Sequence, residues 1–144
     1  MVNRRFKKLA NLQKDKNNSE KKIRNTEKVR ELHKKIVSQK RNKLNRLNRD
    51  LKDLYKIMKN EFEKSNHKKN YTNDEWSRIQ QREQKAINLE KRVEYMKKEI
   101  ENDEKSIRRQ TQRIQDLKKL IKLANNIINS IITEQILNTR GING

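Results

Sequence analysis

Apolar residues recur at every seventh position through the second half of the chain, although only 30% of the sequence is hydrophobic. The members of this row are Ile79, Ala86, Val93, Ile100, Ile107, Ile114, Ile121 and Ile128. A straight α-helix drifts by about 20° every seven residues, so a strict seven-residue repeat keeps one side facing a partner only if the helices supercoil. The row therefore predicts a coiled coil in which these residues occupy the heptad position a.

The second apolar position of the heptad, position d, is less regular. It holds Arg82, Leu89, Met96, Asp103, Gln110, Leu117, Ala124 and Ile131. Polar side chains at d lower the stability of a coiled coil but can fix its register and its choice of partner. The interrupted row leaves two partners open for this seam, which is the stripe of a and d positions: an identical helix in a parallel dimer, or another helix of the same chain.

The start of the helix that carries the seam is well marked. Thr72 and Glu75 have the spacing of a capping box, in which each side chain binds a backbone amide that has no partner within the helix. Tyr71 and Trp76 occupy the flanking positions of a hydrophobic staple. These four residues predict that a helix begins at about residue 73.

The far end of the same helix is the most apolar part of the chain. Between Leu123 and Thr139 the only charged residue is Glu134, and Ile and Leu spread over more than one side of the helix. Burying a large aliphatic side chain contributes about 1.5–3 kcal/mol, so such a face is unfavourable in water. We therefore expect this end to dock on other protein subunits.

The first half of the chain carries a heptad run of its own, which consists of Leu44, Leu47, Leu51, Leu54 and Met58. This spacing predicts a basic helix over residues 19–64. The preceding residues 1–18 are expected to form a basic, flexible arm.

Residues 65–72 contain no aliphatic side chain, which predicts a loop whose length suits two antiparallel neighbours. The following helix is expected over residues 73–140, where Gly141 suits a left-handed cap, and a tail over 141–144. We thus expect an all-α fold in which two long helices form a coiled-coil hairpin. An extended parallel coiled-coil dimer is the alternative.

Positive charge is concentrated in the first half of the chain. Residues 1–73 hold 24 Lys and Arg against 8 Asp and Glu, whereas residues 74–144 hold 15 against 11. The net charges of +16 and +4 together give the formal net charge of +20. A helix with this excess attracts a polyanion, and nucleic acid is favoured because its counterions are released when Lys and Arg neutralise phosphates.

These features predict a non-enzymatic structural protein of a larger assembly, such as a virion, a nucleoid or a ribonucleoprotein, that binds DNA or RNA without sequence selectivity. The expected phosphate-binding residues are Arg4, Arg5, Lys7, Lys8, Lys21, Lys22, Arg24, Lys34, Lys35, Lys40, Arg41 and Lys43. Phe6 and Tyr55 are the only aromatic candidates for base stacking on this basic face. The alternative is a scaffolding coiled coil whose basic half docks on acidic protein surfaces.

The seam is expected to hold several copies of the chain together. The residues predicted to make this oligomer are Ile79, Val93, Ile100, Ile107, Ile114, Ile121, Ile128 and Ile131.

Catalytic and metal-binding patterns are missing from the sequence. It has no cysteine, and His33 and His67 lack a second ligand at metal-binding spacing. The acidic group Glu99, Glu101, Asp103 and Glu104 is flanked by lysines, so a solvated face is expected there. No Gly-rich phosphate loop is present. We expect no enzyme activity, no cofactor, no metal and no small-molecule substrate.

No apolar run approaches the roughly 18 residues that a membrane span requires, and the N-terminal residues lack the apolar core of a signal peptide. A protein without a membrane span is therefore expected, located inside the cell (cytoplasm, nucleus or nucleoid) or inside a virion, and not secreted.

Overall fold

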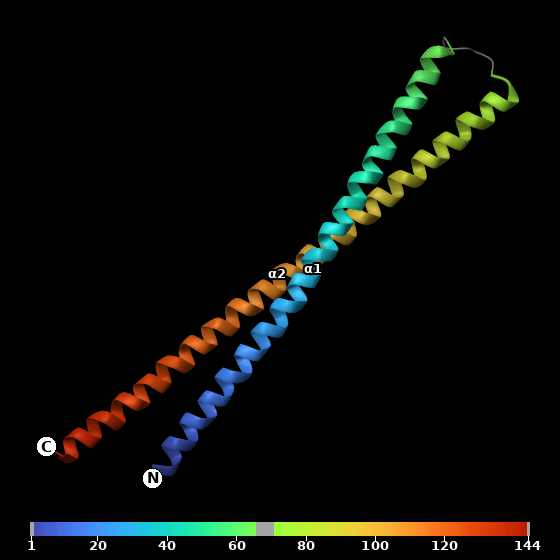
Figure 1. Cartoon of the computed structure of the whole chain (residues 1–144). Helices are drawn as coiled ribbons and strands as arrows, with labels where there is room; N and C mark the ends of the chain where they lie inside the picture. The colour runs from blue at the N-terminus through green and yellow to red at the C-terminus, as the bar shows by residue number, and fades with distance from the viewer. Residues whose placement is uncertain (1, 66–70, 144) are drawn as a thin grey trace. The chain divides into compact units, whose positions relative to one another are not determined.

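The computed structural model consists of two α-helices that pack against each other as an antiparallel hairpin (Figure 1). Helix α1 comprises Val2–Lys64 and helix α2 comprises Asn73–Asn143. The structure describes residues 2–65 and 71–143, with the side chains at 2, 3, 5 and 140–143 excepted, and contains no strand in these ranges. The predicted all-α hairpin is confirmed.

Helix α1 begins at Val2, so residues 2–18 belong to the same helix as the segment after them. No proline or glycine interrupts the chain here. The seam spacing also continues, because Leu9, Leu12 and Lys16 follow one another at intervals of three and four and are each half-buried. The boundary at residue 19 that the sequence suggested therefore does not appear in α1.

Helix α2 begins directly after the residues predicted to cap it. The backbone N–H of Glu75 donates a hydrogen bond of 3.2 Å to the hydroxyl of Thr72, and the ring centroids of Tyr71 and Trp76 lie 6.1 Å apart.

At the other end, α2 continues through Gly141 to Asn143. The expected cap at Gly141 is wrong: a glycine inside a helix costs only about 1 kcal/mol relative to alanine, and no proline follows it. Positions 66–70 of the predicted loop at 65–72 lie outside the described residues.

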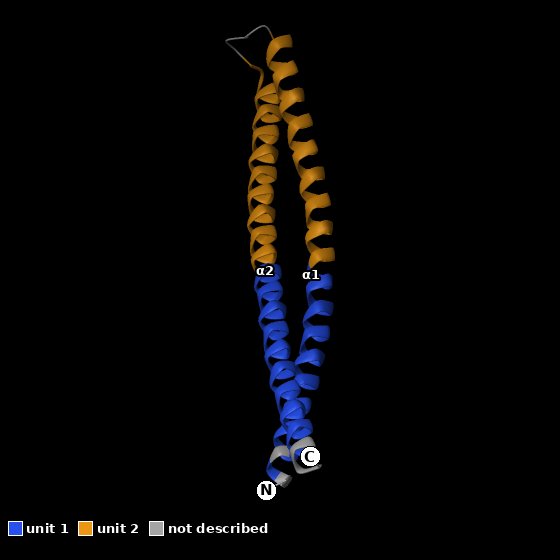
Figure 2. Ribbon diagram, turned by 90° about the vertical axis from the view of Figure 1, so that its left-hand side faces the viewer, with its two compact units in different colours: residues 1–33, 106–144 blue, residues 34–105 orange. Residues whose placement is uncertain are grey.

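Each helix contributes a segment to each of two compact units (Figure 2). One unit comprises Met1–His33 and Ser106–Gly144, and the other comprises Lys34–Lys105. We refer to them as the terminal unit and the loop unit.

The core of the loop unit is a leucine cluster. Leu54 of α1 is buried with Ala86 and Leu89 of α2, and Leu47, Leu51 and Met58 pack against these three. In the terminal unit, Ile23 of α1 is buried with Ile114 and Leu117 of α2, and Ile121 packs against them. Both clusters consist of heptad positions from the two helices, so the seam of α2 is covered by α1.

All three polar residues at d positions of α2 have a polar partner on α1. In the loop unit, Arg82 pairs with Glu61, and Asp103 pairs with Lys40. In the terminal unit, the side-chain amide of Gln110 donates a hydrogen bond of 2.8 Å to Nδ1 of His33. His33 is therefore half-buried in the seam.

These polar pairs also define the register of the loop unit. The step from Lys40 to Glu61 advances three heptads along α1, and the step from Asp103 to Arg82 goes back three heptads along α2. A shift by one heptad would separate Arg82 from Glu61 and Asp103 from Lys40, leaving half-buried charges without a partner, which is costly. The polar d positions thus favour this one antiparallel pairing.

The residues predicted to join several copies of the chain lie in the same intramolecular seam. Val93, Ile100, Ile114 and Ile128 are buried, and Ile79, Ile107, Ile121 and Ile131 are half-buried. Since α1 covers this side of α2 within one chain, these residues do not form an open surface for another copy.

Candidate nucleic-acid interface

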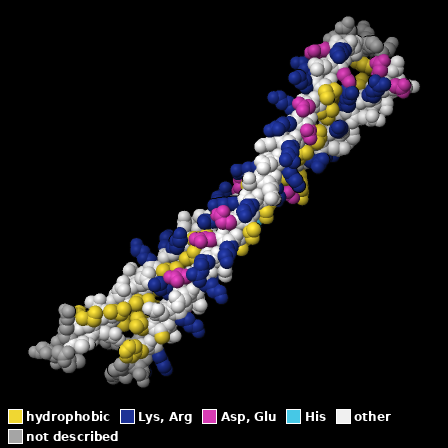
Figure 3. Space-filling view, viewed as in Figure 1, with side chains coloured by type: hydrophobic (Ala, Val, Ile, Leu, Met, Phe, Trp, Pro, Cys, Tyr) yellow, Lys and Arg dark blue, Asp and Glu magenta, His cyan; other side chains and the backbone are white. Residues whose placement is uncertain are grey.

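Figure 3 shows many Lys and Arg side chains at the surface of the molecule. Most of the cations that the sequence singles out are exposed on α1. Those in the terminal unit are Arg4, Lys7, Lys8, Lys21, Lys22 and Arg24, and those in the loop unit are Lys34, Lys35 and Lys43. They stay at the surface because the seam positions of α1 face α2. The side chain of Arg5 lies outside the described residues.

Lys40 and Arg41 are placed differently from the other predicted cations. Lys40 Nζ lies 2.7 Å from Asp103 Oδ2 and 3.6 Å from Glu99 Oε2, while Arg41 pairs with Glu104. The hydrogen bond to Asp103 raises the pKa of Lys40, against a smaller opposing effect of burial. Both cations pair with acidic side chains of α2 and are therefore not part of the candidate interface.

The same contacts change the interpretation of the acidic group on α2. Glu99, Asp103 and Glu104 were expected on a solvated face, but they lie opposite α1 and pair with its cations. Glu101 pairs within α2, with Lys105 at 3.5 Å. The three pairs between α1 and α2 could not be recognised from the sequence, because each joins residues about 60 positions apart.

A basic groove between the helices is the clearest candidate for anion binding in the loop unit. Its volume is about 580 Å³, and it is lined by Lys43, Arg46 and Leu47 of α1 and by Lys91, Arg92, Tyr95 and Met96 of α2. None of the lining residues is acidic. Four cations from two helices therefore share one concave surface, with apolar side chains between them.

Sequence reasoning missed Arg46, Lys91, Arg92 and Tyr95 in this groove. Lys91 and Arg92 lie in the half of the chain with a net charge of only +4. Their neighbours on α1 become visible only once the hairpin register is known. That register could have been tested on the sequence by requiring Arg82, Asp103 and Gln110 each to face a polar residue of α1.

The exposed aromatic residues are spread over both helices. Phe6 and Tyr55, the predicted stacking candidates, are 54% and 43% exposed on α1. Tyr95 is 65% exposed on α2, and it is the one of these three that lines the basic groove. Tyr95 therefore combines an accessible ring with neighbouring cations.

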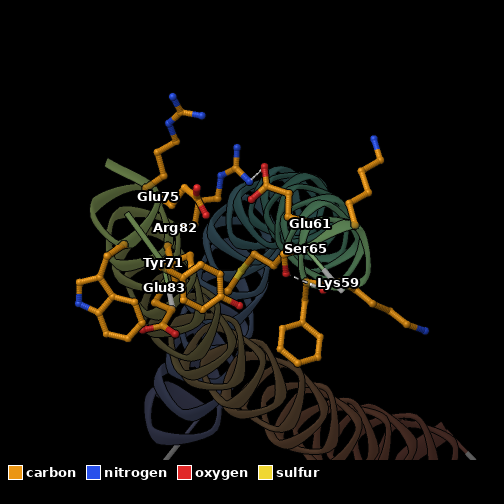
Figure 4. Close-up of a pocket in the computed structure, with 13 residues that line it drawn as sticks. Lys59, Glu61, Ser65, Tyr71, Glu75, Arg82 and Glu83 are labelled. Carbon is orange, nitrogen blue, oxygen red and sulfur yellow. Dashed lines mark hydrogen bonds and ion pairs between the residues drawn. The ribbon is translucent and has the colours of Figure 1, made fainter. Parts of the chain in front are cut away.

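A second cavity, of about 680 Å³, lies where α1 ends and α2 begins (Figure 4). Phe62, Tyr71 and Trp76 supply aromatic walls. Its charged lining residues are of both signs: Lys59, Lys64, Arg78, Arg82, Glu61, Glu75 and Glu83. Figure 4 shows Arg82 directed toward Glu61, with which it pairs. The mixed charge makes this cavity a weaker attractor of phosphate than the basic groove.

The protein is thus a two-helix antiparallel hairpin whose apolar seam contains polar pairs and whose surface carries many exposed cations. No family model, curated protein or solved structure matches the chain. Among the residues that the structure describes, no helix has an apolar stretch long enough to cross a membrane.

Proposed function

We propose that the protein is a non-enzymatic structural component of a nucleic-acid-containing assembly, and that α1 binds phosphates without sequence selectivity. A virion, a nucleoid or a ribonucleoprotein would be such an assembly, which places the protein inside a cell or a virion. The observation that carries the proposal is that most of the predicted cations are exposed on the surface of α1. Nine of the predicted cations have exposed side chains: Arg4, Lys7, Lys8, Lys21, Lys22, Arg24, Lys34, Lys35 and Lys43. Lys40 and Arg41 pair with Asp103 and Glu104 of α2.

This arrangement suits phosphate better than base recognition. Exposed Lys and Arg on the outer side of a helix reach the backbone of a nucleic acid, where contacts fix position but carry no sequence information. For six to ten such contacts the affinity falls by about 10³–10⁵ between 50 and 200 mM salt, because each contact releases condensed counterions at low salt. The small number of aromatic residues limits direct contact with bases.

The direct test is a binding comparison by fluorescence anisotropy at about 50 mM salt, with two duplex DNAs and two duplex RNAs of unrelated sequence. We expect the affinities within each type to agree within about threefold, because phosphate contacts do not depend on sequence. Polyglutamate at matched charge serves as the acidic-protein comparison. Binding to polyglutamate with no binding to any nucleic acid would reject the proposal in favour of a scaffold that docks on acidic proteins.

Assembly through the far end of α2 is the second part of the proposal. Large aliphatic side chains remain exposed there even though α1 covers the seam: Leu120, Leu123, Ile127, Ile132, Ile136 and Leu137. An uncovered apolar surface of this kind is typical of a contact with another protein. These flanking residues, in place of the seam residues, would then join copies of the chain or bind another subunit.

A triple substitution tests self-assembly. Replacing Leu120, Leu123 and Ile127 with Gln is expected to lower the sedimentation mass to that of one chain, because it removes apolar area that an oligomer would bury. Replacing Lys118, Lys119 and Lys122 with Gln is the matched control, since it changes exposed residues of the same segment. If the apolar variant and the wild type have the same oligomeric mass, this surface does not join copies of the chain.

A further inference from the structure

The basic groove of the loop unit brings together side chains that are separated by about 50 residues in the sequence. Lys43 and Arg46 lie on one wall, which α1 provides, and Lys91 and Arg92 lie on the other wall, which α2 provides. All four are exposed. Leu47 and Met96, both half-buried, form the apolar part of the lining between the walls. The groove therefore offers positive charge on two sides and a less polar surface in the middle.

Tyr95 supplies a flat aromatic surface at this groove. The residue is 65% exposed, so its ring is accessible to a ligand. Its hydroxyl donates a hydrogen bond to Glu99, which is the main reason why the pKa of Tyr95 is raised. Glu99 also lies 3.6 Å from Lys40, so its negative charge is partly offset. Glu99 itself does not line the groove.

These properties match one class of ligand better than others. A nucleotide with an unpaired base has a planar aromatic face to stack on Tyr95 and flanking phosphates for the cations. The bases of a duplex are stacked on each other and cannot present that face, so a duplex would use only the cations. A carboxylate-rich peptide would satisfy the charges but leave the aromatic ring and the apolar lining unused.

We propose that this groove is a binding site for single-stranded nucleic acid, in which one unpaired base stacks on Tyr95 and the adjoining phosphates contact Lys43 and Arg46 on one side and Lys91 and Arg92 on the other. The site rests on the proposed function, because it refines the nucleic-acid contact of the same protein. It adds a preference for unpaired strands that the cations of α1 alone would not give.

The experiment compares a labelled 12-nucleotide oligothymidylate with a labelled 12-base-pair duplex by fluorescence anisotropy at fixed salt. Stacking on one aromatic residue is worth enough that Tyr95→Leu is expected to weaken oligothymidylate binding roughly 5- to 100-fold. Duplex affinity should change by less than about twofold, since duplex bases do not reach the ring. Tyr95→Phe keeps the ring and is expected to bind oligothymidylate like the wild type.

Tyr55→Leu is the matched control, because Tyr55 is an exposed tyrosine of the same unit that does not line the groove. If Tyr95→Leu weakens oligothymidylate binding no more than Tyr55→Leu does, while the wild type still binds both ligands, the groove is not the site and the proposed function stands. If the wild type binds neither ligand, the proposed function and the groove fail together.

Discussion

Replacing Leu89 with aspartate is expected to lower the free energy of unfolding of the hairpin by about 3–5 kcal/mol, because the substitution removes buried apolar volume and inserts a carboxylate. Leu89 is 8% exposed and is buried with Leu54 and Ala86. The cluster and the side chains that pack against it are entirely apolar, so no cation of the cluster can offset the new charge. A loss of this size is a large part of the 5–15 kcal/mol that stabilises a typical domain.

The measurement is urea unfolding followed by circular dichroism at 222 nm. Asn88→Asp is the control, because it introduces the same charge at the next residue, which is exposed and keeps an oxygen for the side-chain amide of Gln84. The control should unfold within about 0.5 kcal/mol of the wild type. Equal effects of the two substitutions would show that the helices do not depend on the seam between them.

The second large effect concerns the cations of α1. A variant with six substitutions to Gln, at Arg4, Lys7, Lys8, Lys21, Lys22 and Arg24, is expected to lose at least about two orders of magnitude in affinity for duplex DNA at low salt. All six side chains are exposed and lie in the terminal unit. Because each neutralised phosphate contributes about 0.9 to the slope of log affinity against log salt, that slope should become shallower by up to about 5.

A charge-matched variant separates position from net charge. Replacing Lys97, Lys98, Lys105, Lys118, Lys119 and Lys122 on α2 with Gln removes the same number of exposed cations from the formal net charge of +20. It is expected to weaken binding by no more than about tenfold, because it lowers only the overall positive electrostatic potential of the protein. Similar losses in the two variants would mean that net charge, and not the surface of α1, determines the binding.

Much of the fold follows from local spacing in the sequence. The a row of α2 from Ile79 to Ile128 requires a partner helix, and the residues around Thr72 mark where α2 starts. Both patterns depend only on residues within a few turns of one another. The hairpin was favoured because residues 65–72 lack aliphatic side chains, and the antiparallel packing of α1 and α2 confirms it.

The cross-helix contacts could not be derived in the same way. Lys40 looked like an exposed cation until the register placed it 2.7 Å from Asp103. Such pairs depend on which heptad of α1 lies opposite which heptad of α2, and a shift by seven residues again places a and d positions opposite one another. Polar residues within the seam distinguish these shifts, and they lie far apart in the chain.

In the candidate site, too, some features follow from the local sequence and others depend on the register of the hairpin. The exposed cations of α1 follow from the charge density of the sequence alone, because the exposure of such a side chain does not require a particular neighbour. Lys91, Arg92 and Tyr95 gain significance only when the hairpin sets them beside Lys43 and Arg46. A count of charge along the sequence cannot find a groove that is built from two separate segments.

The salt dependence of nucleic-acid binding tests the central claim most directly. For wild-type protein with two duplex DNAs of unrelated sequence between about 50 and 200 mM salt, we predict parallel lines of log affinity against log salt with slopes of roughly −5 to −9, as expected for six to ten phosphate contacts. An absence of binding at about 50 mM salt, or an affinity that stays constant across this range, would contradict the account.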